Sequence, residues 1–116
     1  MATPPVRSTL IIDQGTTWQR RWRITDADSG LPRDLTGWTA RAQVRAQTMA
    51  ETTLFEWSPE GLTCDDDGYV TMTVTPTESS AWIWRDGMFD VELVDPTGRV
   101  TRIAQGRVRI SPEITR

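Results

Sequence analysis

Two carboxylates on alternate residues are the first candidates for chemistry in this chain. Asp90 and Glu92 flank Val91 in a segment where apolar and polar residues alternate, so both lie on one face of an extended strand. Paired carboxylates can act as acid and base in glycoside hydrolysis. Thr101 and Arg102 face this segment across a turn, and cross-strand ion pairing is the simpler explanation. We therefore predict a charged outer face and no catalytic residues.

Three contiguous aspartates, at positions 65–67, are the acidic cluster to consider as a metal site. A calcium loop needs carboxylates at alternate positions around a turn, whereas contiguous side chains diverge. Gly68 follows them, and Asp and Gly residues are typical of solvated turns. We predict a turn here, no bound metal and no cofactor. The lone cysteine, Cys64, excludes an intrachain disulfide and is expected to be a small buried apolar residue.

The chain contains neither histidine nor lysine, and all 13 of its basic residues are arginine. These absences remove the commonest general base, the commonest metal ligand and the Schiff-base nucleophile. The formal net charge of −3 argues against nucleic-acid binding as the main role. We therefore expect a protein that is not an enzyme and has no nucleic-acid partner.

Arginines recur on the polar faces of two predicted strands. Arg41 and Arg45, together with Arg21 and Arg23, form a basic stripe if the strands share a sheet. Such a stripe suits an acidic partner or nucleic acid; the alternative is the solvated side of a sheet. We expect no aromatic residue between these arginines, so the stacking platform of single-strand binders is missing.

The six tryptophans divide into two groups by their surroundings. Those on apolar strand faces are predicted to be core: Trp18, Trp22 and Trp38. Those near loops or a helical turn either cover one end of the core or anchor a partner or a carbohydrate: Trp57, Trp82 and Trp84.

The elements that must position these residues are about seven or eight short strands and one helical turn. Alternation and turn signals predict strands at 9–13, 17–25, 38–46, 53–57, 62–64, 69–75, 87–94 and 100–111. The last two form a hairpin around Asp95-Pro96-Thr97-Gly98, with a bulge expected at Gln105 and Gly106. A capping box of Thr75, Pro76 and Glu78 predicts one helical turn that reaches about Trp84, with Ile83 packed against the core.

The length of 116 residues and the strand pattern predict one domain, an all-β antiparallel β-sandwich. We place an extended N-terminal arm at 1–8, the sandwich at 9–111 and a C-terminal tail at 112–116. No apolar run is long enough to span a bilayer or serve as a signal peptide, so we expect synthesis in a cytoplasm and no membrane partner.

Four segments resemble a known family: LIIDQGTTW at 10–18, DLTGWTAR at 34–41, DGYVTMTV at 67–74 and GRVRISPEITR at 106–116. The chain is similar over nearly its whole length to the immunoglobulin-like N-terminal domain of phage baseplate upper proteins. The resemblance implies an immunoglobulin-like sandwich in a virion, made in the host cytoplasm. It also implies a non-enzymatic tail or baseplate adaptor or connector, present in multiple copies among other virion structural proteins. The larger relatives continue into a receptor-binding module, which this chain is not expected to contain.

Two alternative functions remain open at this point, a capsid-surface decoration protein and a carbohydrate-binding module that aids host attachment. A hydrolase is the least expected class. We expect residues 1–8 or 111–116 to contact another subunit. The predicted partner-binding residues are Pro4, Pro5, Arg7, Arg41, Arg45, Trp57, Trp84, Ile114 and Arg116.

Overall fold

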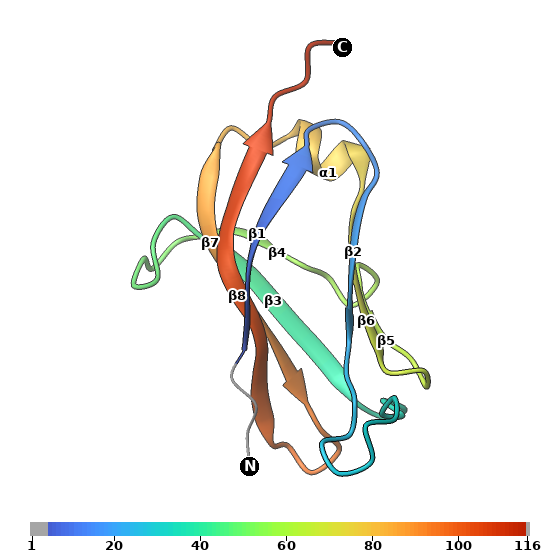
Figure 1. The fold of residues 1–116 in the computed structure, drawn as a ribbon. Coiled ribbons are helices and arrows are strands. Elements are labelled where there is room, and N and C mark those ends of the chain that lie inside the picture. The colour runs from blue at the N-terminus through green and yellow to red at the C-terminus, as the bar shows by residue number, and fades with distance from the viewer. Residues whose placement is uncertain (1–4, 116) are drawn as a thin grey trace.

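The computed structural model describes residues 5–115, which fold into eight strands and one short helix. In chain order these are β1 (Val6–Asp13), β2 (Trp18–Arg23), β3 (Thr39–Arg45), β4 (Thr53–Glu56), β5 (Leu62–Cys64), β6 (Tyr69–Val74), α1 (Pro76–Ser80), β7 (Asp86–Val94) and β8 (Val100–Ser111). A five-stranded sheet of order β1-β8-β7-β3-β4 packs against a three-stranded sheet of order β2-β6-β5 (Figure 1). The predicted all-β sandwich is confirmed.

The strand order is that of an immunoglobulin-like sandwich. The strands β3, β7 and β8 take the places of C, F and G, while β2, β6 and β5 take those of B, E and D. One pairing departs from the expected antiparallel pattern, because β1 pairs with β8 in parallel. The edge strand β1 therefore belongs to the five-stranded sheet and lies directly beside the last strand of the chain.

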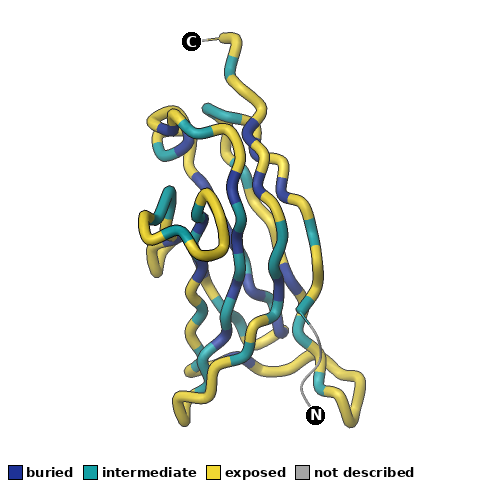
Figure 2. Tube along the Cα trace, turned by 90° about the vertical axis from the view of Figure 1, so that its left-hand side faces the viewer, coloured by how far each residue is buried: buried dark blue, intermediate teal, exposed yellow. Residues whose placement is uncertain are grey.

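The core forms where alternate residues of the two sheets face each other. In β6, Val70, Met72 and Val74 are fully buried, as their alternation with threonine predicts. Across the interior, Trp22 stacks on Phe89 at a centroid distance of 6.4 Å, and its Nε1 donates to Sδ of Met72 at 3.0 Å. Buried and exposed positions alternate along the strands (Figure 2).

The hairpin of β7 and β8 closes through the predicted turn, where Oδ1 of Asp95 accepts from the N–H groups of Thr97 and Arg99. The predicted bulge at Gln105 and Gly106 is wrong. Instead, Val91 faces Ala104 and Glu92 faces Arg102, which leaves Ile103 as the extra residue.

Gly106 has a different role from the one predicted, because the backbone of β1 passes close to it at Ser8. A Cβ atom there would lie 1.7 Å from the carbonyl oxygen of Ser8. Only glycine lets the two backbones approach this closely.

The first strand begins at Val6, three residues earlier than predicted, because pairing with β8 continues back to the contact between Val6 and Ala104. Residues 6–8 are therefore part of the sheet and not of an arm. Pro4 and Arg116, both predicted partner-binding residues, lie outside the described residues.

The capping box is confirmed: Glu78 N–H donates to Oγ1 of Thr75 at 3.1 Å, and Thr75 N–H donates to Oε1 of Glu78 at 2.9 Å. The helix ends at Ser80, earlier than expected, and Trp82 turns into the core. Ile83, which we predicted to pack against the core, is instead 94% exposed.

We predict that Gly106→Ala lowers the free energy of unfolding by about 3 kcal/mol, because the new methyl group forces β1 away from β8. The matched control is Gly98→Ala, where φ is +92° but no atom lies within 4 Å of the Cβ position. The control should cost only the left-handed backbone penalty of about 1 kcal/mol. Urea denaturation measures both, and equal losses would contradict the close-approach explanation.

Candidate functional site

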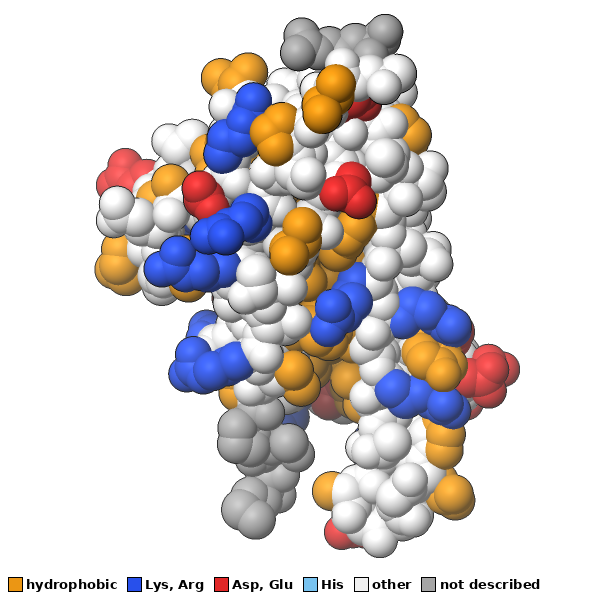
Figure 3. All heavy atoms as spheres, turned by 45° about the horizontal axis from the view of Figure 1, so that its top comes forward, with side chains coloured by type: hydrophobic (Ala, Val, Ile, Leu, Met, Phe, Trp, Pro, Cys, Tyr) orange, Lys and Arg blue, Asp and Glu red, His pale blue; other side chains and the backbone are white. Residues whose placement is uncertain are grey.

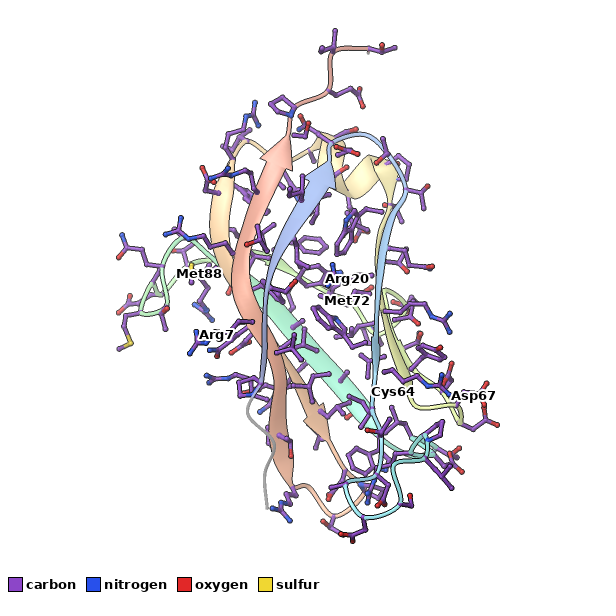
Figure 4. The ribbon with its side chains drawn as sticks, viewed as in Figure 1. Arg7, Arg20, Cys64, Asp67, Met72 and Met88 are labelled. Carbon is purple, nitrogen blue, oxygen red and sulfur yellow. The ribbon has the colours of Figure 1, made fainter. Side chains whose placement is uncertain are left out.

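The outer face of the five-stranded sheet carries a hollow of about 520 Å³, which we call the arginine groove. Strands β1, β3, β7 and β8 supply its lining, because alternate side chains of each strand point away from the core. The lining residues that matter below are Arg7, Arg45, Met88, Asp90, Arg102 and Gln105. Figure 4 labels Arg7 and Met88 on this side of the molecule.

The two carboxylates considered for catalysis lie on this face, and each is paired with an arginine. Asp90 Oδ2 lies 3.4 Å from Nε of Arg102, and Glu92 Oε1 accepts a hydrogen bond of 2.7 Å from Nε of Arg41. Arg41 stands directly opposite Glu92 in the pairing of β3 with β7. Cross-strand ion pairing, the simpler prediction, is therefore confirmed.

The pKa of Asp90 is shifted by its position on this surface. Burial raises the pKa of its carboxyl above the ordinary value, and the negative charge of Glu92 raises this pKa further. The positive charges of Arg102, Arg41 and Arg45 oppose the rise without cancelling it. Holding Asp90 in its ionised form therefore costs folding free energy at neutral pH.

Arg45 is occupied by its own loop. Its Nη1 donates to the carbonyl oxygens of Ala50 and Glu51 at 2.8 and 2.6 Å, and its Nη2 donates to Oε1 of Gln43 at 2.9 Å. These bonds hold the segment between β3 and β4 against the rim of the groove. Arg45 therefore shapes the surface on which it was predicted to bind a partner.

The condition for a single basic stripe is not met, because Arg21 and Arg23 lie on β2 in the other sheet. There they surround Tyr69, whose ring centroid is 3.7 Å from Cζ of Arg21 and 4.4 Å from Cζ of Arg23. The expectation that no aromatic residue lies among these arginines is wrong, because Tyr69 pairs with Arg23 in the sheet register.

The tryptophans divide differently from the prediction. Trp57 and Trp82 are only 4% and 8% exposed, and both make edge contacts with Phe55. Trp84 is half-buried against Trp82, with 4.7 Å between their centroids. Trp18 and Trp38, predicted to be core, are only partly buried.

The burial of the tryptophans argues against two predicted roles, a partner anchor at Trp57 and a carbohydrate-binding platform. Trp57 is too buried to anchor a partner, because the closure of β4 onto β3 carries it inward. All six rings are buried or half-buried in the part of the chain that the structure describes, so no exposed pair offers a carbohydrate platform there.

A second surface lies at the end of the sandwich where α1 and the C-terminal tail meet. Gln14 joins them: its Nε2 donates to the carbonyl oxygens of Ser79 and Trp82, both at 3.1 Å, and its Oε1 accepts from Glu113 N–H at 3.3 Å. Its own N–H donates to the carbonyl oxygen of Ser111 at 2.9 Å. One side chain thus holds three segments together.

We call this region the Gln14 end and define it by Gln14, Ile83, Arg85, Glu113 and Ile114. Ile83 and Ile114 are each 94% exposed, and each directly follows a residue whose backbone is bonded to Gln14. The predicted partner residue Ile114 is therefore exposed next to a residue that is bonded to Gln14. Figure 3 shows hydrophobic side chains among charged ones at this end.

The aspartates at 65–67 form a turn, in which Oδ1 of Asp65 accepts from the N–H groups of Asp67 and Tyr69. Within residues 5–115, no group of three or more acidic, cysteine or histidine residues is arranged to hold a metal. Cys64 is half-buried, and burial, reinforced by the charge of Asp65, raises the pKa of its thiol.

Of the other predicted partner residues, Arg7 and Arg41 are exposed on the outer face, and Pro5 is half-buried. The helix found in the described chain, five residues long, is too short to cross a bilayer. Sequence reasoning missed two surface residues: Gln14, which joins three segments, and Arg107, which lines a smaller hollow beside the arginine groove. Gln14 carries no local signal, since its partners lie 65–99 residues away; Arg107 could have been found from the alternation of β8.

Comparison with known proteins supports the fold. No protein-family model matches the chain, and a search of curated proteins finds none similar in sequence. Its fold matches 132 chains of solved structures, so the fold is widely shared. One such chain comes from a structure that describes the basis of T cell specificity and activation by the bacterial superantigen toxic shock syndrome toxin-1. It is 10% identical with a TM-score of 0.51, over 90% of this chain and 93% of that one, a likeness of fold alone.

We predict that Gln14→Ala lowers the free energy of unfolding by about 2–3 kcal/mol, because two carbonyls and one N–H lose their partner. Hydrogen exchange at the Glu113 amide should also become faster. The control is Gln19→Ala, whose exposed side chain makes one bond of 3.3 Å to Thr73 and should cost less than about 0.5 kcal/mol. Equal effects of the two variants would refute the joining role of Gln14.

The pKa shift of Asp90 predicts a pH dependence. A carboxyl pKa raised by folding contributes stability that is present below its ordinary value of 3.8 and lost as pH rises through the folded value. The unfolding free energy of Asp90→Asn, relative to the parent, should therefore increase between pH 3.8 and neutrality.

The matched control for this pH dependence has the opposite sign. The hydroxyl of Thr97 and the N–H of Arg99 lower the pKa of Asp95, so Asp95→Asn should lose stability relative to the parent as pH rises towards and through 3.8. Urea denaturation from about pH 3 to pH 7 compares the two variants across these carboxyl pKa values. Slopes of the same sign would contradict the assignment.

Proposed function

We propose that this chain is a non-enzymatic structural protein of a tailed-phage particle, an adaptor or connector associated with the tail or baseplate. The resemblance of segments 10–18, 34–41, 67–74 and 106–116 to baseplate proteins supports the location. The observation that carries an assembly role is the Gln14 end, where two isoleucines are 94% exposed and each follows a residue that is bonded to Gln14.

The two exposed isoleucines gain free energy when an interface removes them from water. Burying one isoleucine in an interface contributes about 1.5–3 kcal/mol. An exposed aliphatic group on a mobile segment would lose part of that gain to ordering. Ile83 and Ile114 avoid this loss, since Gln14 already holds the backbone beside each of them. The Gln14 end is therefore suited to contact with a neighbouring protein.

The ion pairs on the outer face of the five-stranded sheet also support a structural role. Asp90 and Glu92 each form an ion pair with an arginine, so they belong to a charged surface and not to a catalytic pair. A surface of this kind sets orientation and rejects wrong partners more than it contributes affinity.

The location is tested by immuno-electron microscopy on intact particles with antibodies against this chain. Label on the tail or baseplate supports the proposal. Label over the capsid surface would replace it with the decoration role, and unlabelled particles that contain all other structural proteins would overturn it.

We predict that combining Ile83→Asp with Ile114→Asp reduces incorporation into particles by at least about tenfold, because two interface side chains are lost. Folding should change by less than about 0.5 kcal/mol, since both residues are exposed. Quantitative mass spectrometry of purified particles measures incorporation. The control is Met49→Asp, an equally exposed apolar residue in the segment between β3 and β4. Wild-type incorporation of the double variant would exclude the Gln14 end as the contact.

A further inference from the structure

Arginines are concentrated on the outer face of the five-stranded sheet around the arginine groove and the hollow beside it. Three ion pairs neutralise its carboxylates on β7: Arg109 with Asp86, Arg102 with Asp90, and Arg41 with Glu92. Three further arginines at the two adjoining hollows of this face have no carboxylate partner among residues 5–115: Arg7, Arg45 and Arg107. Arg7 and Arg107 are exposed, so their guanidinium groups can accept a partner.

The chain as a whole has a formal charge of −3, and six of its 16 acidic residues lie in the loops that follow β2 and β5. We call this region the acidic end: Asp26, Asp28, Asp34, Asp65, Asp66 and Asp67. Two backbone bonds join its loops, from Leu35 N–H to the Asp65 carbonyl at 3.1 Å and from Ile24 N–H to the Gly68 carbonyl at 2.7 Å. The acidic end is therefore one surface made of two segments.

Most of these aspartates are unpaired. Within residues 5–115, only Asp26 among them forms an ion pair, with Arg33 at 3.2 Å. Asp34 and Asp65 accept bonds within their own turns. The carboxylates of Asp28, Asp66 and Asp67 are exposed and accept no bond within residues 5–115.

We propose that the arginine groove of one copy binds the acidic end of a second copy. Two exposed arginines, Arg7 and Arg107, meet free carboxylates of the acidic end, and bonds between guanidinium and carboxylate groups are among the strongest hydrogen bonds in proteins. The groove, at about 520 Å³, is within the size range of binding pockets and can receive the tip of the turn between β5 and β6. This inference rests on the proposed assembly role and names one of its contacts.

The placement of the two surfaces determines the kind of assembly. Figure 4 labels Arg7 and Asp67 on opposite sides of the sandwich, so one copy can use both surfaces at once. Contact between unlike surfaces is heterologous, which generates a ring when the rotation closes and a filament when it does not. The proposed contact thus provides a route to several copies in symmetric order.

A charge-swap experiment tests this contact on the purified full chain. One variant combines Arg7→Glu with Arg107→Glu, and the other combines Asp66→Arg with Asp67→Arg. Arg45 is left intact because it holds the loop between β3 and β4. Each variant alone presents two surfaces of like charge, whereas an equimolar mixture restores opposite charges at every contact.

Sedimentation equilibrium at about 50 mM salt should show association of the parent chain, weakened at about 500 mM as screening shortens the range of the charges. Each variant alone should associate at least about tenfold more weakly, and the mixture should recover the parent behaviour. The control combines Arg85→Glu with Arg99→Glu, which makes the same change in net charge as the arginine variant at other surfaces and should leave association intact. Circular dichroism confirms folding of every variant.

Two results would overturn the inference: a parent chain that stays monomeric at low salt, or a mixture that associates no better than its components. A monomeric parent would also direct attention to an acidic segment of another protein as the occupant. Because the measurement uses the purified chain alone, its failure is distinguishable from failure of the proposed function, which the labelling of particles decides.

Discussion

The parallel pairing of β1 with β8 is the interaction on which both surfaces of this protein depend. It places Arg7 opposite Gln105 on the outer face, and it brings the end of β1 beside Ser111, from which Gln14 reaches α1 and the tail. The pairing is possible because Gly106 has no side chain where the backbone of β1 passes close to it at Ser8. Gly106 therefore affects both the arginine groove and the Gln14 end, because both depend on the pairing of β1 with β8.

Stability and recognition are supplied by different parts of the sandwich. The interior is apolar and stacked, with Trp22 against Phe89 and Phe55 between Trp57 and Trp82. The exposed ion pairs contribute little to stability, as is usual at a surface. Asp90 even opposes folding when ionised, since its burial raises its pKa. Such charges are better understood as features that orient a partner than as supports of the fold.

Local patterns in the sequence were sufficient for the elements whose cause is local. The alternation of Val70, Met72 and Val74, the capping box at Thr75 and the turn at Asp95 all follow from residues within a few positions of one another. The start of β1 at Val6, the bulge at Ile103 and the joining role of Gln14 could not be predicted, because each depends on a strand or segment far away in the chain. The partner-binding role of Trp57 was wrong for the same reason, since its burial depends on how β4 meets β3. The phage location stays a prediction from resemblance.

The parallel arrangement of β1 and β8 also has a mechanical consequence. The two ends of the described chain leave the sandwich at opposite ends, and the strands that lead to them are bonded side by side over eight positions (Figure 1). Tension applied between the ends would act along these strands and load their hydrogen bonds together in shear, whereas an antiparallel pair pulled from one end opens bond by bond. Resistance to such tension is governed by the unfolding rate and not by the equilibrium stability.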